Sequence, residues 1–476
     1  MKPPRPSGRG GTVYAAFPRL KSGAVLRLRT RTAFRQPADR CGVGHSGKVY
    51  EFDPGAFAFL RECDGRTPLA TLRRRHAALF DASLPDARLA AELAADPTLS
   101  DLIEVQPRPA PSDPNQVVET AGLACACRIA VWQITSACDL SCRHCYLDAR
   151  PTGKTFDRRT MLATVRNLHA IGVEGVRLSG GEPTLRPTLL ESVCAALAEH
   201  CLPFSVNSNA AGDVSALARV FRRHPDLARF VQVSLDGPGS AHDAFRGQAG
   251  AYERSLANLR RLKAGGVPVC VVSMMHRGWL GQEARLAKDL ASAGVDQWTV
   301  ELPVAAGRWR SAAARHALDR QGIAAMSARL VQVTAGAFRV FEINQVFRRP
   351  AEAGEIQKTG TSPVCMHHLG LLTIDEKGLS FCSVFGDTFG PSLTAFAPSY
   401  GSRASFFRAW NRIARARISR RIADNPACRA CKLLAECQGG CPGHYPKAAA
   451  FSGCDRHARL LTEVRLSLAK RLRSGS

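Results

Sequence analysis

The sequence leads us to expect neither a membrane anchor nor a secretion signal. It contains no run of eighteen apolar residues, and its nearest approach, 267–275, has the length of a buried strand. Residues 1–6 are basic and proline-rich and lack the apolar centre of a signal peptide. These absences predict a cytoplasmic protein with no membrane contact. In that reducing compartment its 17 cysteines are expected to serve metal binding or catalysis rather than disulfides.

Acidic residues are few compared with basic ones. Aspartate and glutamate number 40 against 65 lysines and arginines, which gives a net charge of +25 at pH 7. Such a charge can indicate a nucleic-acid partner. However, the chain has no basic repeat interleaved with aromatic residues, and solvated arginine-rich helix faces explain the charge as well. The basic stretch 408–421 would equally attract an acidic peptide, so a nucleic-acid partner is not expected.

Three cysteines, Cys138, Cys142 and Cys145, follow an apolar run, 129–135, that predicts a buried strand. Iron–sulfur clusters are normally held by four cysteine thiolates. Three thiols in one short loop therefore indicate a cubane cluster with one iron open for a ligand or substrate. This spacing leaves two alternatives, a zinc site that lacks a ligand and three ordinary buried thiols.

A second motif, Gly180-Gly181-Glu182-Pro183, follows another apolar run, 175–178. Paired glycines let the backbone approach a small polar ligand closely, and the Glu182 carboxylate can bind an ammonium group. Alone, the motif is typical of a turn, but here it comes one strand–helix unit after the three cysteines. Together the two motifs resemble those of the radical S-adenosylmethionine (SAM) superfamily.

The resemblance implies that the thiolates of Cys138, Cys142 and Cys145 hold a [4Fe–4S] cluster whose fourth iron chelates the amino and carboxylate groups of SAM. Segment 180–183 would contact the methionine part of SAM. His144 stands where the family often has an aromatic residue near the adenine. Reduction by a donor such as flavodoxin or ferredoxin would cleave SAM and release a 5′-deoxyadenosyl radical.

Residues 128–349 alternate between strand and helix patterns. This alternation predicts parallel strands with right-handed crossovers, and the resemblance implies an α/β fold built as a partial (β/α)6 barrel. Cys138 and Gly180 follow predicted strands, so we expect the chemistry at the C-terminal strand ends. The predicted strands are 129–135, 175–179, 204–209, 229–236, 267–274 and 297–304.

Polar residues also mark the ends of the third and fourth predicted strands. Asn207 and Asn209 are two apart, as are Ser234 and Asp236, so each pair shares a face of its strand. The stretch 233–247 resembles the peptide-modifying branch of the superfamily. That likeness implies that Asn209 and Ser234 line the nucleoside pocket and that Asp236 can act as a catalytic base. A structural role for Asp236 in a turn is the alternative.

Residues 24–106 predict a small winged-helix-like domain, after frayed residues 1–22 and before a proline-rich linker, 107–127. It resembles the peptide-chaperone domain of pyrroloquinoline-quinone biosynthesis, which implies that a leader peptide adds to it as a strand. A structural or DNA-binding winged helix is the alternative. The predicted elements are strands 24–28 and 48–52 around a glycine-rich turn at 42–47, helices beginning at residues 54, 67 and 85, and strand 102–105.

The C-terminal segment, 362–460, is rich in cysteine. Four of its thiols fall within fourteen residues and require a partner, for which a zinc ribbon is one candidate. The spacing of the whole set resembles the SPASM extension of radical SAM enzymes, which binds two auxiliary [4Fe–4S] clusters. The cysteines of the segment are Cys365, Cys382, Cys428, Cys431, Cys437, Cys441 and Cys454.

The resemblance also divides these cysteines between the two auxiliary clusters. The second cluster would take Cys428, Cys431, Cys437 and Cys454, and the first would take Cys365, Cys382 and Cys441. No further cysteine lies shortly after Cys365, which departs from fully ligated members of the family. Either His367, His368 or Asp387 supplies the fourth ligand, or one iron is open and can bind a substrate thiolate.

These features predict a radical SAM peptide or protein maturase with three [4Fe–4S] clusters. It would abstract a hydrogen from a ribosomally made peptide or a small protein subunit and close a thioether or carbon–carbon crosslink. One alternative is a maturase that forms thioethers in an amine dehydrogenase subunit or oxidises a sulfatase residue. Others are a nucleic-acid-modifying radical enzyme and a zinc-binding adaptor without catalytic activity.

Overall fold

The computed structural model describes a large part of the 476-residue chain, which divides into two compact units. The N-terminal unit comprises Met1–Gly122 with Glu199–Cys201, and the second unit comprises Leu123–Ala198 and Leu202–Ser476. No helix of the described part is both long and apolar enough to cross a bilayer. The described residues are 16–20, 25–29, 40–45, 48–52, 54–111, 117–119, 129–170, 173, 175–343, 347–349, 371–376, 378–380, 426–433 and 456–474.

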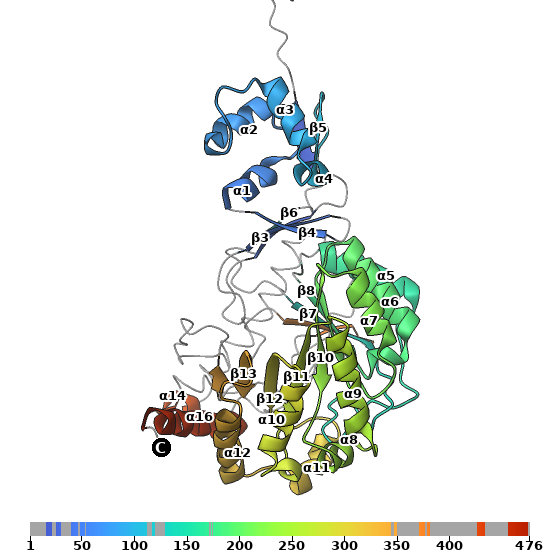
Figure 1. The fold of residues 1–476 in the computed structure, drawn as a ribbon, viewed down its shortest axis with the longest axis vertical. Helices are drawn as coiled ribbons and strands as arrows, with labels where there is room; N and C mark the ends of the chain where they lie inside the picture. Colours follow the sequence, from blue (N-terminus) through green and yellow to red (C-terminus); the bar gives the residue numbers. More distant parts are fainter. Residues whose placement is uncertain are drawn as a thin grey trace, which may run out of the picture. The chain divides into compact units, whose positions relative to one another are not determined.

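The N-terminal unit combines two small sheets with short helices (Figure 1). One sheet pairs β1 (Phe17–Leu20) antiparallel with β5 (Ile103–Gln106). The other has the order β4-β3-β2-β6, in which only the β2–β6 pair is parallel. Its strands are β2 (Val25–Arg29), β3 (Arg40–His45), β4 (Lys48–Phe52) and β6 (Val117–Glu119).

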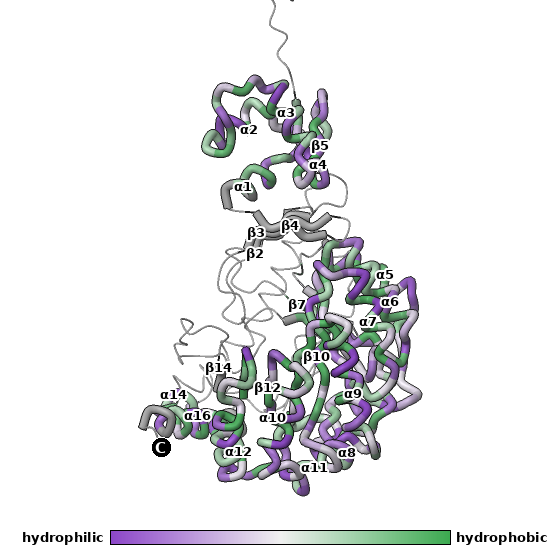
Figure 2. The backbone as a smooth tube through the Cα atoms, viewed as in Figure 1, coloured by the Kyte–Doolittle hydropathy of each residue, from purple (hydrophilic) through white to green (hydrophobic). Residues whose placement is uncertain are grey.

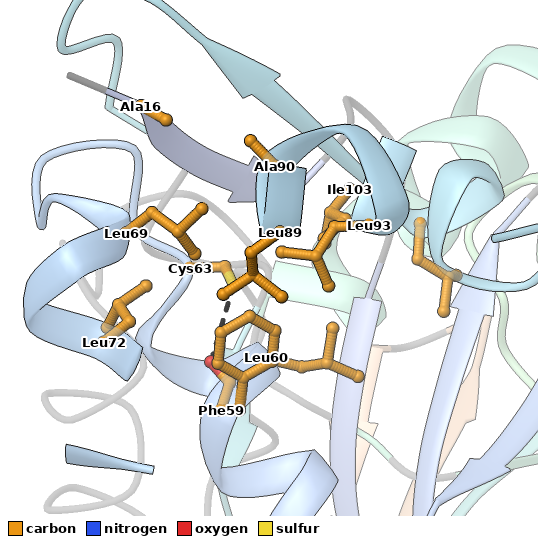
Figure 3. Packing of buried hydrophobic residues seen from close by; sticks show 11 residues of the cluster. Ala16, Phe59, Leu60, Cys63, Leu69, Leu72, Leu89, Ala90, Leu93 and Ile103 are labelled. Carbon is orange, nitrogen blue, oxygen red and sulfur yellow. Dashed lines mark hydrogen bonds between the residues drawn. The ribbon is translucent and has the colours of Figure 1, made fainter. Parts of the chain in front are cut away.

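The helices of this unit build an apolar core. Leu60, Leu72 and Leu102 are completely buried, and the thiol of Cys63 lies among them and donates to the Phe59 carbonyl oxygen at 3.5 Å (Figure 3). Burial of this kind supplies the main stabilising free energy of a small unit. The helices are α1 (Pro54–Glu62), α2 (Leu69–Arg75), the 3₁₀ turn η1 (Ala77–Leu79), α3 (Asp86–Ala95) and α4 (Leu99–Leu102).

The predicted helices of the N-terminal unit are present, but three other expectations are wrong. Residues 40–45 form strand β3 rather than part of a turn, because β2 and β4 pair with both of its edges. Residues 17–20 are not frayed, since β5 supplies them with ladder hydrogen bonds. The predicted linker contains strand β6, which pairs with β2.

The second unit is built on a ten-stranded sheet in the order β14-β13-β12-β11-β10-β9-β8-β7-β15-β16. The pairs from β7 to β13 are parallel, so the predicted α/β class is confirmed, and β7 to β12 correspond to the six predicted strands. The strands are β7 (Ile129–Thr135), β8 (Gly175–Gly180), β9 (Phe204–Ser208), β10 (Ala228–Ser234), β11 (Val269–Met274), β12 (Gln297–Glu301), β13 (Val340–Ile343), β14 (Phe347–Arg349), β15 (Leu371–Asp375) and β16 (Gly378–Ser380).

Helices line the outer side of this curved sheet (Figure 1), and hydrophobic and hydrophilic stretches alternate along them, as in amphipathic helices (Figure 2). The helices and 3₁₀ turns of this unit are α5 (Arg158–Ala170), η3 (Pro183–Leu185), α6 (Pro187–Glu199), α7 (Ser215–Arg223), α8 (Ser240–Arg246), α9 (Ala251–Ala264), η4 (Arg277–Trp279), α10 (Glu283–Ser292), α11 (Trp309–His316), α12 (Arg320–Val333), α14 (Pro426–Arg429) and α16 (Arg456–Ser474).

The sheet extends beyond the six predicted strands on both sides. β13 adds a seventh parallel strand next to β12. On the other side β15 pairs in parallel with β7, although its residues fall within the segment predicted as a separate cysteine-rich extension. The strand that precedes the three cysteines therefore has a neighbour on each edge, β8 and β15.

Candidate functional site

The three predicted cluster ligands lie in the loop that directly follows β7. Cys138 and Cys142 are buried, and Cys145 is half-buried. Leu140 and Ala149 form a small buried cluster with them. The loop therefore has its own apolar packing at the C-terminal end of a central parallel strand, which is the edge of the sheet where chemistry was predicted.

The end of α8 holds one side of this loop. The Ser141 and Arg143 amides donate to the carbonyl oxygens of Arg246 and Phe245 at 3.2 and 2.8 Å. Gly247 follows with a φ of +74°, and a Cβ there would lie 2.9 Å from the Ser141 carbonyl oxygen. Only glycine allows both this backbone conformation and this close approach.

The segment after β12 holds the other side of the loop. The Arg308 amide donates to the Cys145 carbonyl oxygen at 3.0 Å, and its Nε donates to that of Cys142 at 2.9 Å. Its Nη1 lies 3.1 Å from Asp148 Oδ1. A Cβ on Gly307 would stand only 2.3 Å from the Cys145 carbonyl oxygen. No sequence signal predicts this contact, because Gly307 and Arg308 match no motif.

Two of the sulfur atoms accept hydrogen bonds of the kind that stabilise thiolates. Arg246 Nη1 donates to Cys142 Sγ at 3.7 Å, and the Ala149 amide donates to Cys145 Sγ at 3.4 Å. Burial raises the pKa of the Cys138 thiol to about 12 and raises the pKa of Cys142, whose shift Arg246 opposes. Since these thiols ionise only with difficulty by themselves, they suit a bound metal that supplies the compensating positive charge.

A cluster and a single metal ion require different arrangements of their ligands. Among the described residues no three histidine, cysteine or acidic side chains come close enough together to hold one metal ion. A zinc site needs its ligands to converge on a single point. In a [4Fe–4S] cluster each thiolate binds a different iron, so the three thiols of this loop need not converge. The donor set, three thiols in one loop, fits a cluster that keeps one iron open.

The predicted glycine motif lies against the cysteine loop. A Cβ on Gly180 or Gly181 would stand 2.0 Å from the carbonyl oxygen of Thr135 or Ala137, respectively. The Gly181 and Glu182 amides donate to the same two oxygens, each at 2.7 Å. Both glycines are therefore needed for the chain's own packing, because they let the end of β8 reach the start of the loop.

The Glu182 carboxylate is buried and takes four hydrogen bonds from its own chain. Oε1 accepts from the Thr184 amide and hydroxyl at 3.0 and 2.8 Å and from Ser208 Oγ at 2.8 Å, while Oε2 accepts from the Asn209 amide at 2.6 Å. Burial raises the pKa of Glu182, and these bonds oppose the shift. Glu182 thus joins β8 to β9, with buried Pro183 beside it, and its binding of an ammonium group stays a prediction.

Asn209 connects the end of β9 to the cysteine loop. Its Nδ2 donates to Oδ1 of Asp139 at 2.9 Å, and its Oδ1 accepts from the Ala211 amide at 2.7 Å. Ser234 lies half-buried at the end of β10, in register with Val272. The structure places both residues at the C-terminal strand ends, and their predicted contact with the nucleoside stays a prediction.

Asp236 is completely buried and paired with Arg246. Its Oδ2 lies 2.6 Å from Arg246 Nε, and its Oδ1 accepts from the Met274 amide at 2.7 Å. Burial alone would raise the pKa of Asp236, but the Arg246 guanidinium holds it at about 2. The carboxylate is thus ionised and a weak proton acceptor as it stands. The role of Asp236 as catalytic base stays a prediction. The alternative, a structural role in a turn, did not include the ion pair with Arg246.

A stack of three rings contacts Asp236 and includes two residues that the sequence did not single out. The Phe245 ring lies between His144, 4.8 Å away between centroids, and His276, 3.8 Å away, and all three rings are nearly parallel. His276 Nε2 lies 3.0 Å from the Asp236 carbonyl oxygen. Burial lowers the pKa of His144 to about 3, so the imidazole is neutral. His276 follows β11 directly, which is the one signal that could have marked it.

One face of the sheet next to the site carries a row of polar residues. Gln133 is paired in register with Ser179, and Asn207 with Gln232. Gln133 Nε2 and Asn207 Oδ1 are buried without a hydrogen-bond partner. An unsatisfied buried amide group costs free energy, so this row suits a polar ligand that supplies the missing bonds.

The predicted tail ligands are described only in part. Cys428 is buried in α14 and Cys431 is half-buried one turn later, with its amide 3.1 Å from the Cys428 carbonyl oxygen. The assignment of the auxiliary clusters therefore stays a prediction. The candidates that lie outside the described residues are Cys365, His367, His368, Cys382, Asp387, Cys437, Cys441 and Cys454.

The part of the chain that contains the cysteine loop matches the model of a known family. Residues 132–291 match the model of the radical SAM superfamily. These residues form a radical SAM domain. The superfamily implies a [4Fe–4S] cluster and SAM, and the thiols of the loop after β7, together with the unsatisfied amides beside them, fit such a pair of groups.

Curated relatives of this radical SAM domain have names of two kinds, one that refers to heme and one that refers to peptides or their maturation. Pre-heme d1 synthase of Dinoroseobacter shibae is 31% identical over 221 residues, which are 45% of this chain and 54% of that protein. The sporulation killing factor maturation protein SkfB of Bacillus subtilis is 26% identical over 34% of this chain and 39% of its own length. The PqqA peptide cyclase of Methylorubrum extorquens is 29% identical over 36% and 43%. The chain thus spans about half the length of these relatives, or less.

Solved structures share the fold at low sequence identity. Streptococcus suis SuiB, bound to its precursor peptide SuiA, aligns over 89% of this chain and 95% of its own with a TM-score of 0.56 and 13% identity. The enzyme anSMEcpe with bound AdoMet aligns over 73% of this chain and all of its own, with a TM-score of 0.52 and 14% identity. These neighbours share the α/β fold of this chain.

Proposed function

We propose that the chain is a radical SAM maturase that abstracts a hydrogen from a ribosomally made peptide or a small protein subunit and installs a thioether or carbon–carbon crosslink. The observation that carries the proposal is the loop of Cys138, Cys142 and Cys145, held at the end of a central parallel strand with donors on two of its sulfurs. Two curated relatives with peptide-maturation names, SkfB and PqqA peptide cyclase, support the substrate class.

The residues around the loop have distinct tasks in this proposal. When bound, the cluster and SAM supply a carbon-centred radical that can remove an unactivated hydrogen. Cys138, Cys142 and Cys145 hold the cluster, while Gly181 and Glu182 fix the edge of β8 against the loop. The unsatisfied amides on β7 and β9 offer hydrogen bonds to a polar ligand, and His144, Asn209 and Ser234 line the strand ends beside it.

The N-terminal unit would recognise the leader segment of the peptide. Its four-stranded sheet ends at β4 on one side, and among the described strands none covers the outer edge of β4. An extended peptide can add to such an edge through main-chain hydrogen bonds. The structure of SuiB with its precursor peptide, which aligns over 89% of this chain, supports a peptide partner.

The C-terminal segment would carry the two auxiliary clusters and accept the electron left after crosslinking. Its described thiols, Cys428 and Cys431, have the CxxC spacing expected of cluster ligands. A reductant such as flavodoxin or ferredoxin would supply electrons to the first cluster. We expect all of this chemistry in the cytoplasm, without nucleic acid or membrane.

A second candidate function is modification of a tetrapyrrole. It is favoured by one specific finding, the 31% identity to pre-heme d1 synthase, which exceeds the identity to SkfB or PqqA peptide cyclase. The two candidates share the cluster loop and differ in the substrate, so they separate only when substrates are compared.

The first test is metal content and SAM cleavage after anaerobic reconstitution. We expect about 12 iron and 12 sulfide per chain with negligible zinc, and 5′-deoxyadenosine when dithionite and SAM are added. About 4 iron with one or two zinc would retain the radical SAM domain and overturn the auxiliary clusters. Absence of both iron and SAM cleavage would overturn the proposed function. The Cys142→Ala variant is the matched control and should form no 5′-deoxyadenosine.

The second test compares substrates. Peptides encoded by short reading frames beside the gene, and separately iron coproporphyrin III, are incubated with the reconstituted enzyme and SAM. A peptide that loses two hydrogens, detected by mass spectrometry, supports the maturase. A SAM-dependent change in the porphyrin, with no change in any peptide, favours the tetrapyrrole candidate instead.

A further inference from the structure

The ion pair of Asp236 and Arg246 is the most enclosed one in the described part of the chain. The side chain of Asp236 is 0% exposed and that of Arg246 is 9% exposed, and each of the other described ion pairs has at least one more exposed partner. Taking two charges out of water is costly. A buried ion pair next to the cysteine loop therefore indicates a functional role.

Arg246 connects this pair directly to a predicted cluster ligand. Its Nη1 donates to Cys142 Sγ at 3.7 Å while its Nε contacts Asp236 at 2.6 Å. Its carbonyl oxygen accepts from the Ser141 amide of the same loop. The guanidinium is thus fixed at both ends, and the cationic group lies between the sulfur and the carboxylate.

Asp236 is fixed just as firmly. Its second oxygen accepts from the Met274 amide, its own amide donates to His242 Nδ1 at 2.9 Å, and its carbonyl oxygen lies 3.0 Å from His276 Nε2. His144 Nδ1 lies 3.8 Å from Oδ2 of the same Asp236 side chain. These contacts hold the Asp236 carboxylate in place beside the Arg246 guanidinium.

A fixed charge beside an iron–sulfur cluster changes its reduction potential. Reduction adds an electron to the cluster, so a nearby cation favours the reduced state and a nearby anion opposes it. Arg246 touches the ligand sulfur, whereas Asp236 reaches it only through Arg246. The carboxylate therefore partly cancels the effect of the guanidinium.

We infer that Asp236 and Arg246 are positioning residues that together set the reduction potential of the cluster held by Cys138, Cys142 and Cys145. The inference rests on the proposed function, because it requires that cluster. It gives Asp236 a role that differs from the catalytic base implied by family resemblance. Neutralising either partner moves the potential, and the two shifts have opposite signs.

The test is EPR-monitored redox titration of the reconstituted full-length protein. Only the part of the reduced-cluster signal that changes when SAM is added is followed, since this isolates the SAM-binding cluster from any other cluster. Asp236→Asn leaves the cation uncompensated and should shift the potential to more positive values. Arg246→Gln leaves the carboxylate and should shift it to more negative values.

Each shift should change the ratio of reduced to oxidised cluster at a fixed potential by about tenfold, which is 59 mV for a one-electron couple. Arg246→Lys keeps the charge and should remain closer to wild type than Arg246→Gln. The double variant, Asp236→Asn with Arg246→Gln, should lie between the two single variants. If Arg246→Gln holds no cluster, the sign of the shift in Asp236→Asn still tests the inference, with Arg246→Lys as the variant that keeps the charge.

Arg219→Gln is the matched control, because it removes the arginine of an exposed ion pair, with Glu191, far along the chain from the cysteine loop. It should leave the potential unchanged. A wild-type protein without a SAM-responsive signal would overturn the proposed function. A wild-type signal with unshifted potentials in Asp236→Asn and Arg246→Gln would overturn the inference alone, and so would shifts of the same sign.

Discussion

The apolar core of the N-terminal unit and the cysteine loop after β7 both bury thiols, but in different electrostatic surroundings. Cys63 lies among leucines and phenylalanines and donates its proton to the Phe59 carbonyl oxygen, and burial raises the pKa of its thiol. Cys142 is also buried, yet its sulfur accepts from the Arg246 guanidinium. Donors to the sulfur, rather than burial, thus distinguish Cys142 and Cys145 from the packing thiol of Cys63.

The largest expected effect comes from removing one thiol in each region. Cys142→Ala should lose about 4 iron per chain and the SAM-responsive EPR signal, because the cluster loses a ligand. Cys63→Ala should keep all of its iron and lower the free energy of unfolding by about 1 kcal/mol. Iron analysis and thermal unfolding measure both. Loss of iron in Cys63→Ala would contradict the distinction between Cys63 as a packing residue and Cys142 as a metal ligand.

Gly181→Ala should have the next largest effect. Its new Cβ would stand 2.0 Å from the Ala137 carbonyl oxygen, so β8 and the loop must separate, at a cost of about 1–3 kcal/mol. We expect reduced cluster retention after gel filtration. Gly212→Ala is the control, since the nearest atom to its Cβ would be 3.8 Å away. Equal iron content in the two variants would argue that the glycine motif does not support the loop.

Arg308→Lys should have a smaller effect on the same loop. Lysine cannot reach the Cys142 carbonyl oxygen and Asp148 at once with the planar fork of arginine. Loss of one such charged hydrogen bond costs about 1.5–3 kcal/mol, which we expect to appear as faster release of iron to a chelator. Arg310→Lys, on the exposed side of the same segment, is the control. Identical rates of iron release in Arg308→Lys and Arg310→Lys would show that the Arg308 side chain does not stabilise the loop.

Asp319→Ala should have the smallest effect of these variants on the free energy of unfolding, and it should not change cluster binding. Asp319 caps α12 by accepting from the Gly322 amide at 2.7 Å, and loss of such a cap costs about 1 kcal/mol. Thermal unfolding should begin at a lower temperature, with iron content unchanged. Asp296→Ala, which removes only an exposed ion pair with Lys263, should cost less. A change in iron content in Asp319→Ala would show that stability and cluster binding are not separable here.

The sequence predicted the strands and motifs of this site but not the contacts between distant segments. Cys138, Gly180 and Asp236 could be placed because each follows an apolar strand of clear length. The hydrogen bond from Arg308 to the Cys142 carbonyl oxygen could not be predicted, because the two residues are 166 positions apart and meet only once the strands are arranged in the sheet. The turn predicted at 42–47 is wrong for a related reason, because pairing with β2 and β4 made most of it a strand.

Strand β15 has a consequence for how the protein is made. β7, which leads into the cysteine loop, gains its second neighbour only when residues 371–375 have been synthesised. Until then one edge of an apolar strand has unpaired main-chain groups, a state that favours aggregation. Iron insertion should therefore follow synthesis of this strand, and a chain cut after residue 349 should yield insoluble protein even though it contains the complete radical SAM motif.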